Sequence, residues 1–143
     1  MSGTIWVTDR EPGIRLLFGE LLPQAHLLDP AALIDRLDHH ERPDALVIDG
    51  TQLLELTDRQ RADLLALPRV LICTGLSLTS IPMSLVAGPG VSVLAKPFCV
   101  EDLEVAVEWL RGNSADLAPP DPLPAIAAAR RRRRAGGAAG PAT

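Results

Sequence analysis

The stretch that decides the fold is Pro43-Asp44-Ala45-Leu46-Val47-Ile48-Asp49. Its apolar run is continuous and is bounded by polar residues, without the alternation expected of a strand with one wet face. Such runs are typical of strands buried on both faces, as in a parallel sheet. In open α/β sheets ligands bind beyond the carboxyl ends of the strands, so the position of Asp49 marks it as a candidate site residue.

Four further short apolar segments predict strands on either side of this one. They cover 4–7, 26–28, 70–73 and 91–94. Between them lie segments with helical features, and one of these has apolar residues at helical spacing in Ile14, Leu17, Phe18 and Leu21. Alternating strands and helices predict an α/β domain, a doubly wound five-stranded parallel sheet of (βα)5 type over residues 3–111.

Helix boundaries are also marked in the sequence. Asp29-Pro30 is a helix start, with an N-cap followed by a first-turn proline. Thr57 and Gln60 fit a capping box, which predicts a helix to about Leu67. The last helix has its apolar face on Leu103, Ala106, Val107 and Leu110. The segment 77–86 is ambiguous, because its proline allows only a short helix.

Composition excludes several classes of protein. The chain has 143 residues, of which 47% are apolar, so it can bury a core. No apolar stretch is long enough to predict a transmembrane helix. Cys73 and Cys99 are too few for a disulfide framework or a four-cysteine zinc site, and we expect a reducing, cytoplasmic location.

The basic residues are unevenly distributed. Thirteen are arginines, five of them consecutive from Arg130 to Arg134, and Lys96 is the single lysine. Residues 1–118 carry a net charge of −8 and residues 119–143 a net charge of +4. The composition predicts a folded domain over 1–112 and a disordered Ala/Pro/Arg-rich tail over 113–143. Nucleic acid or an acidic partner is expected only at this arginine run, whose alternative is a tail without a role.

Polar residues follow the predicted strands at the same edge of the sheet. They are Asp9, Asp49, Thr74 and Lys96. A carboxylate can act as a nucleophile, a second can help hold a divalent cation, and a hydroxyl and an ammonium can hold phosphoryl oxygens. The alternatives are that Asp49 is an ordinary strand-ending or helix-capping residue and that Thr74 only satisfies a backbone group.

Four motifs in order resemble the receiver domain of two-component response regulators. They are Asp9-Arg10-Glu11-Pro12, the Pro43–Asp49 stretch, Thr74-Gly75 and Lys96-Pro97-Phe98. The resemblance covers residues 3–111 and implies a flavodoxin-like fold. It implies that Asp49 is the phosphoacceptor, with Lys96 as its partner and Thr74 as the switch hydroxyl. It further implies Mg²⁺ bound by Asp9, Asp49 and the backbone carbonyl of Thr51.

Three departures mark the acidic pocket as degenerate. Arg10 stands where the family has a second acidic residue, and an arginine cannot coordinate a cation. We therefore expect Mg²⁺ binding to be weakened, and we hypothesise that Arg10 pairs with Asp49 in its place, the alternative being a solvated loop arginine. Gly50-Thr51-Gln52-Leu53 replaces the usual loop after the phosphoacceptor, and Val93 occupies the aromatic switch position.

Two functions remain open. The first is phosphorelay signalling, in which a histidine kinase phosphorylates Asp49 of a response-regulator receiver that is not itself an enzyme. The alternative is a phosphorylation-independent pseudo-receiver that binds another signalling protein. The resemblance also implies a homodimer through the face formed by the fourth helix, fifth strand and last helix. No membrane partner is expected.

Overall fold

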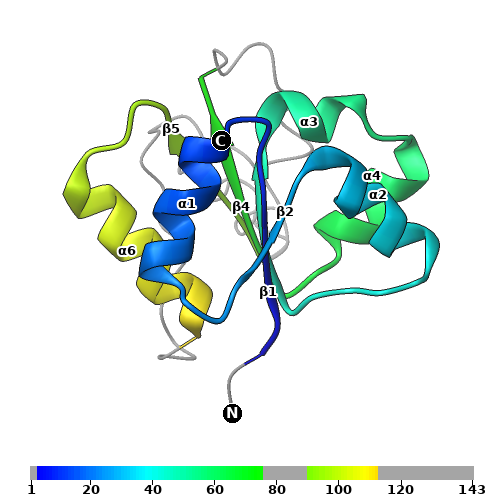
Figure 1. Ribbon diagram of the computed structural model, residues 1–143, viewed down its shortest axis with the longest axis horizontal. Helices are drawn as coiled ribbons and strands as arrows, with labels where there is room; N and C mark the ends of the chain where they lie inside the picture. Colours follow the sequence, from blue (N-terminus) through cyan, green and yellow to red (C-terminus); the bar gives the residue numbers. More distant parts are fainter. Residues whose placement is uncertain (1–2, 76–89, 113–143) are drawn as a thin grey trace, which may run out of the picture.

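A computed structural model of the chain describes residues 3–75 and 90–112. Its sheet has five parallel strands in the order β2-β1-β3-β4-β5. The strands are β1 (Ile5–Thr8), β2 (His26–Leu28), β3 (Ala45–Asp49), β4 (Arg69–Thr74) and β5 (Val91–Ala95). This confirms the predicted α/β fold with a five-stranded parallel sheet, which Figure 1 shows nearly edge-on.

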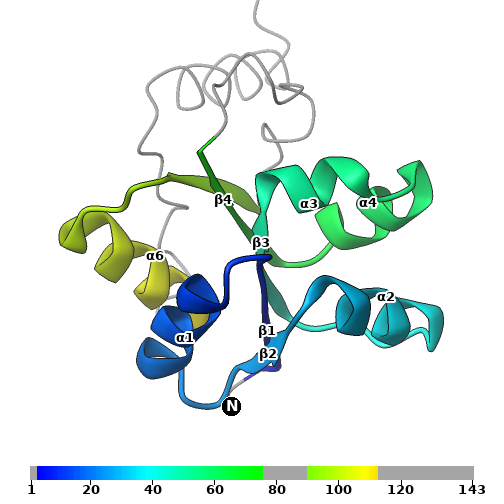
Figure 2. The same cartoon turned by 45° about the horizontal axis from the view of Figure 1, so that its top comes forward.

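Helices cover both faces of the sheet (Figure 2). Their bounds are α1 (Pro12–Leu21), α2 (Pro30–Asp38), α3 (Gly50–Glu55), α4 (Asp58–Leu65) and α6 (Val100–Arg111). One core cluster lies between the sheet and α2, α3 and α4, and contains Trp6, Leu33 and Ile48. The other lies under α1 and α6 and contains Phe18 and Trp109. The central strands are therefore buried on both faces, as the apolar run of β3 predicted.

The register aligns the carboxyl ends of the strands. Thr8 pairs with Ile48, Asp49 with Cys73, and Thr74 with Ala95. The residues that follow β1, β3 and β5 consequently meet at one edge of the sheet.

Both predicted helix starts are confirmed. The Asp29 side chain accepts a hydrogen bond from the Ala32 backbone N–H at 2.8 Å. Thr57 and Gln60 form a complete capping box, with side-chain-to-backbone bonds of 3.1 and 3.0 Å. These caps satisfy N–H groups that have no partner inside a helix.

The prediction of a loop after Asp49 is wrong, because α3 begins directly at Gly50. The Asp49 carboxylate is the N-cap of this helix and accepts a hydrogen bond from the Gln52 N–H at 3.1 Å. Leu53 is completely buried in the core cluster with α2 and α4. Capping and burial together stabilise a helix of only six residues, which has too few intrahelical bonds to be stable alone.

Other expectations can be compared with the described ranges. Trp6, Cys73 and Trp109 are buried, as predicted, and the three histidines are exposed. The segment 77–86 and the predicted tail 113–143 lie outside the described residues. Within those ranges no helix is long and apolar enough to cross a bilayer.

Candidate functional site

The site is centred on the ammonium group of Lys96. Its Nζ lies 3.0 Å from Asp9 Oδ2 and 3.0 Å from Asp49 Oδ1. Glu11 Oε1, on the rim, is 3.6 Å away. Asp9 is almost completely buried, and the side chains of Lys96 and Asp49 keep only 15% and 12% of their exposure. The structure therefore joins three residues that lie 40 or more positions apart in the sequence.

The remaining carboxylate oxygens of the two aspartates are held by backbone groups. Asp9 Oδ1 accepts from the Glu11 N–H at 2.9 Å, and Asp49 Oδ2 accepts from the Gln52 N–H at 3.1 Å. Each carboxylate consequently has one ammonium partner and one backbone partner. Such charge-assisted bonds fix the orientation of a buried carboxylate more firmly than solvation does.

The electrostatic environment favours the charged form of Lys96. Partial desolvation lowers its pKa, but the hydrogen bonds and charges of Asp9 and Asp49 raise it more, so its pKa lies above the ordinary lysine value. Lys96 therefore stays positively charged where it contacts Asp9 and Asp49. In contrast, burial raises the pKa of the nearby Cys73 thiol, which favours its neutral form.

Thr74 lies at the same edge of the sheet. Its backbone carbonyl accepts from the Lys96 N–H at 2.9 Å, which ties the end of β4 to the residue that carries the ammonium. Its side chain packs against Gly50, where an added β-carbon would be 2.7 Å from Thr74 Oγ1. The predicted site residues Asp9, Asp49, Thr74 and Lys96 are thus all brought together.

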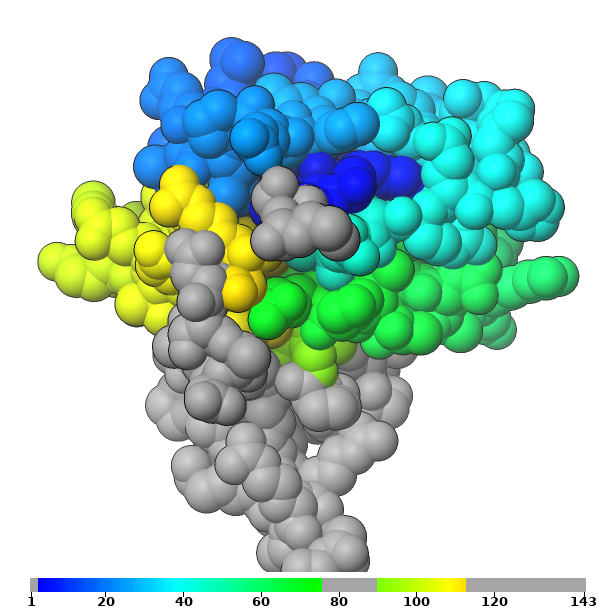
Figure 3. Space-filling model, turned by 90° about the horizontal axis from the view of Figure 1, so that it is seen from below, coloured from blue at the N-terminus to red at the C-terminus, as the bar shows by residue number. Residues whose placement is uncertain are grey.

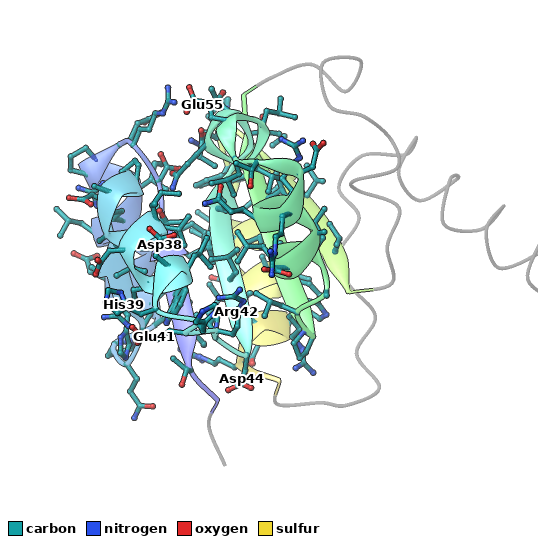
Figure 4. All side chains as sticks on the ribbon, turned by 90° about the vertical axis from the view of Figure 1, so that its right-hand side faces the viewer. Asp38, His39, Glu41, Arg42, Asp44 and Glu55 are labelled. Atoms are coloured by element: carbon teal, nitrogen blue, oxygen red, sulfur yellow. The ribbon has the colours of Figure 1, made fainter. Side chains whose placement is uncertain are left out.

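Arg10 does not pair with Asp49, and that hypothesis is wrong. Its guanidinium forms an ion pair with Glu55 at the end of α3. Because α3 begins directly after β3, it carries Glu55 over the loop that holds Arg10, and a half-exposed carboxylate there is easier to reach than a buried one. Figure 4 shows Glu55 at this end of the molecule. Lys96 is the cation that neutralises Asp49.

The residues present do not fit a divalent cation. The Lys96 ammonium lies between the two carboxylates that would bind the metal. Thr51 is in the first turn of α3, and carbonyls of helical residues point along the axis toward the carboxyl end, away from Asp9 and Asp49. Across the described ranges no group of three or more His, Cys, Asp and Glu side chains is placed to hold a metal ion.

Sequence reasoning missed Gln52. Its Nε2 donates to Thr8 Oγ1 at 2.7 Å, which connects α3 to the end of β1 beside Asp9. Gln52 is 3% exposed, and its Oε1 has no hydrogen-bond partner among the described residues. A glutamine three residues after Asp49 would have been notable only if the start of α3 had been predicted.

Comparisons with known proteins support the fold. No family model matches the chain, and no curated protein matches it. Two solved structures of NtrX from Brucella abortus, in complex with ATP and with ADP, match 95% and 96% of the chain. Their TM-scores are 0.51 and 0.53, both at 17% identity, and the chain spans 29% of the length of each.

NtrX is a response regulator. At this identity the similarity concerns architecture, and it supports a receiver-like, flavodoxin-type α/β fold for this chain. It does not transfer the activity, ligands or partners of NtrX, most of whose length has no counterpart here.

Proposed function

We propose that the chain is a receiver-type signalling module that acts by binding another protein, without Mg²⁺-dependent phosphorylation. The observation that carries this proposal is the contact of Lys96 with both Asp9 and Asp49. The receiver-like fold and the four motifs support a role in two-component signalling, with a histidine kinase or another signalling protein as partner. Binding rather than turnover is the proposed activity.

The chemistry of phosphoryl transfer supports the phosphorylation-independent form. Transfer to a carboxylate requires that positive charge neutralise the incoming phosphoryl oxygens. Here both candidate cations already have carboxylate partners, because Lys96 contacts Asp9 as well as Asp49, and Arg10 pairs with Glu55. The Asp49 oxygens are also hydrogen-bonded, one to Lys96 and the other to the first turn of α3. An acceptor in this environment is a poor nucleophile.

The second candidate function is a phosphorelay receiver that accepts a phosphoryl group on Asp49. It is favoured by the placement of Lys96 against Asp49 and by the proximity of Thr74 to the residue after it. In this function the Asp49 carboxylate attacks phosphorus, and the kinase histidine leaves. Lys96 would have to exchange an aspartate contact for a phosphoryl oxygen.

Intact-mass measurement after incubation with a small phosphodonor and Mg²⁺ separates the two functions. We expect no phosphoryl adduct on the wild-type chain at any donor concentration. An adduct of one phosphoryl group that disappears in Asp49→Asn would establish the phosphorelay function instead. A typical receiver domain, treated in parallel, verifies that the donor is active.

A partner-binding measurement tests whether binding is independent of Asp49. Once a signalling protein that binds the chain is available, Asp49→Asn should leave its affinity within about twofold, because the variant keeps a capping side chain for α3. A large change that depends on the phosphodonor would contradict the proposal. The expected dimer face includes residues 77–86, which lie outside the described ranges. Analytical ultracentrifugation (sedimentation velocity) of the full chain therefore measures its oligomeric state directly.

A further inference from the structure

Arg36 on α2 contacts residues of two neighbouring strands at the β2 edge of the sheet. Its guanidinium carbon lies 5.4 Å from the centre of the Trp6 ring on β1, and its Nη1 lies 3.0 Å from His26 Nδ1 on β2. Trp6 and His26 are register partners, so their side chains leave the sheet on the same face. In Figure 3, which views the molecule from the amino ends of the strands, the blue segment that includes β2 lies beside the cyan α2. One side chain of α2 therefore contacts both strands.

Strand β2 has few other contacts that attach it to the domain. It is three residues long, and in the described sheet it pairs with β1 alone. Leu28 is the one residue of the strand that is buried, whereas His26 and Leu27 are exposed. Short edge strands with little buried surface belong to the parts of a fold that open most readily. The contact between His26 and Arg36 is consequently a substantial part of the attachment of β2 to α2.

The geometry fixes the protonation state of His26 in this contact. An arginine guanidinium is always protonated and can only donate, so His26 Nδ1 accepts the hydrogen bond and carries no proton. The ring is therefore the neutral tautomer, with its proton on Nε2. Histidine side chains change charge between about pH 5 and 8, and the charged ring donates from both nitrogens. Protonation of His26 thus replaces a hydrogen bond with two cations in contact.

The charged groups around β2 do not offset this repulsion. Strand β1 has no ionisable side chain. The charged residues on the two helices that pack against β2 are Arg15 and Glu20 on α1 and Asp29, Asp35, Arg36 and Asp38 on α2. Among the described residues, Arg36 is the one charged side chain within hydrogen-bond or ion-pair distance of the His26 ring, and the histidine that pairs with a carboxylate is His39. A charged His26 therefore faces Arg36 without a carboxylate in contact.

We propose that His26, Arg36 and Trp6 form a pH-sensitive switch at the edge of the sheet. In the closed state, neutral His26 keeps Arg36 over the Trp6 ring and β2 against α2. Protonation of His26 displaces the guanidinium, which uncovers Trp6 and loosens β2. The closed state is present above the pH range in which histidine titrates and is lost as the pH falls through it. The three residues are not part of the site around Lys96, so the switch does not depend on whether Asp49 is phosphorylated.

Exchange of the Trp6 indole proton with water, followed by NMR on the full-length chain, tests the proposal. Trp6 is 1% exposed and its Nε1 has no hydrogen-bond partner among the described residues, so the exchange rate reports access of water to the ring. Relative to the intrinsic rate at each pH, this rate should rise several-fold between about pH 8 and pH 5. Trp109, buried in the other core cluster, is the internal control and should not change. Long-range ¹H–¹⁵N spectra at the higher pH should place the His26 proton on Nε2.

Three variants separate the switch from a general effect of acid. His26→Gln cannot gain a charge but still offers a carbonyl oxygen to Arg36, so the Trp6 exchange rate should stay low at both pH values. Arg36→Met should raise that rate at both pH values and remove its pH dependence. His39→Gln/His40→Asn leaves His26 as the single histidine of the chain and should behave like the wild type. Asparagine is chosen at position 40 because it tolerates the φ of 60° found there.

Three outcomes would overturn the proposal. The first is a His26 proton on Nδ1 at the higher pH, which leaves Arg36 without an acceptor. The second is a wild-type Trp6 exchange rate that does not depend on pH. The third is a pH dependence that persists in His26→Gln, which would assign the opening to another group. Amide-shift dispersion in the same spectra reports whether each variant is folded, and Arg36→Gln, with the same expected result, replaces Arg36→Met if that variant is not.

Discussion

The two ends of the sheet differ in how their charged side chains are paired. At the carboxyl end, Lys96, Asp9 and Asp49 are buried together and satisfy one another. At the amino end, Arg69 lines an open groove and forms no ion pair within the described ranges. At the end where α/β folds usually bind ligands, the charged side chains therefore contact one another, whereas the described residues give Arg69 no such partner at the opposite end.

The largest expected effect is at Lys96. Lys96→Met removes the cation between two buried carboxylates and should lower the free energy of unfolding by roughly 3 kcal/mol, as is typical when one member of a buried ion pair is lost. Chemical denaturation at neutral pH measures this. Arg59→Met, at an exposed position, is the control. A loss below about 1 kcal/mol would show that the carboxyl end is not held by this contact.

The pH dependence of the same contact has a defined sign. Because the folded-state pKa of Lys96 is raised, its contribution to stability is complete below about 10.5, the ordinary value, and is lost as pH rises beyond it. The difference in stability between wild type and Lys96→Met should therefore narrow only in strongly alkaline solution. Narrowing between pH 7 and 9 would contradict this assignment.

The close approach of β4 to α3 gives the next effect. Gly50→Ala places a methyl group 2.7 Å from Thr74 Oγ1 and 2.8 Å from its Cβ, and should cost about 1–3 kcal/mol. Gly13→Ala is the matched control in α1, because no atom lies within 4 Å of the added carbon. That variant should be neutral or slightly stabilising. Equal melting temperatures for the two variants would show that the packing at Thr74 is loose.

Substitution of Arg10 tests whether the pocket around Asp9 and Asp49 can bind Mg²⁺. Wild-type stability should be insensitive to millimolar Mg²⁺. Arg10→Asp adds a carboxylate beside Asp9, and the added negative charge should allow Mg²⁺ to displace the Lys96 ammonium from Asp9 and Asp49. The expected Mg²⁺-dependent stabilisation is on the order of 1 kcal/mol at five times the Kd. Thermal denaturation with and without Mg²⁺ measures both, with Ca²⁺-free buffer throughout. A saturable, sub-millimolar response of the wild type would refute the conclusion that its pocket does not fit a cation.

Removing the charge at the amino end of the sheet should destabilise the protein less than removing Lys96 at the carboxyl end. Arg69→Met removes at most a surface ion pair and should cost less than about 1 kcal/mol. The contrast with Lys96→Met is the direct measure of how differently the two ends of the sheet use charge. Equal losses of unfolding free energy for the two substitutions would contradict this contrast.

His39 provides the smallest effect. It lies at the end of α2, near Asp38 and Glu41 (Figure 4), where its ring contacts the Asp35 carbonyl at 2.7 Å. That hydrogen bond, followed by the Asp35 charge, raises its pKa above 6.5. Its contribution is therefore present below pH 6.5 and is lost as pH rises through the folded pKa. The melting temperature of the wild type should therefore decline slightly as the pH rises just above neutrality, and His39→Gln should remove this decline.

The sequence determined much of the fold on its own. The uninterrupted apolar run before Asp49 predicted a strand buried on both faces, because such a strand has no wet side to mark with polar residues. Local capping signals predicted the starts of α2 and α4, because a cap is made by residues within four positions of one another. The convergence of Asp9, Asp49 and Lys96 followed from the parallel order of the strands.

Only the tertiary structure decided how those residues are paired. The start of α3 depends on the burial of Leu53 against α2 and α4, which no local pattern of a six-residue helix contains. Helix α3 in turn brings Glu55 to Arg10 and directs the Thr51 carbonyl away from Asp9 and Asp49. Which groups can reach the two aspartates is therefore decided by the packing of α3. The groove beside Arg69 is also a product of assembly, because its walls come from β1, β4, α6 and the α1–β2 turn, and no single segment of the sequence specifies the space between them.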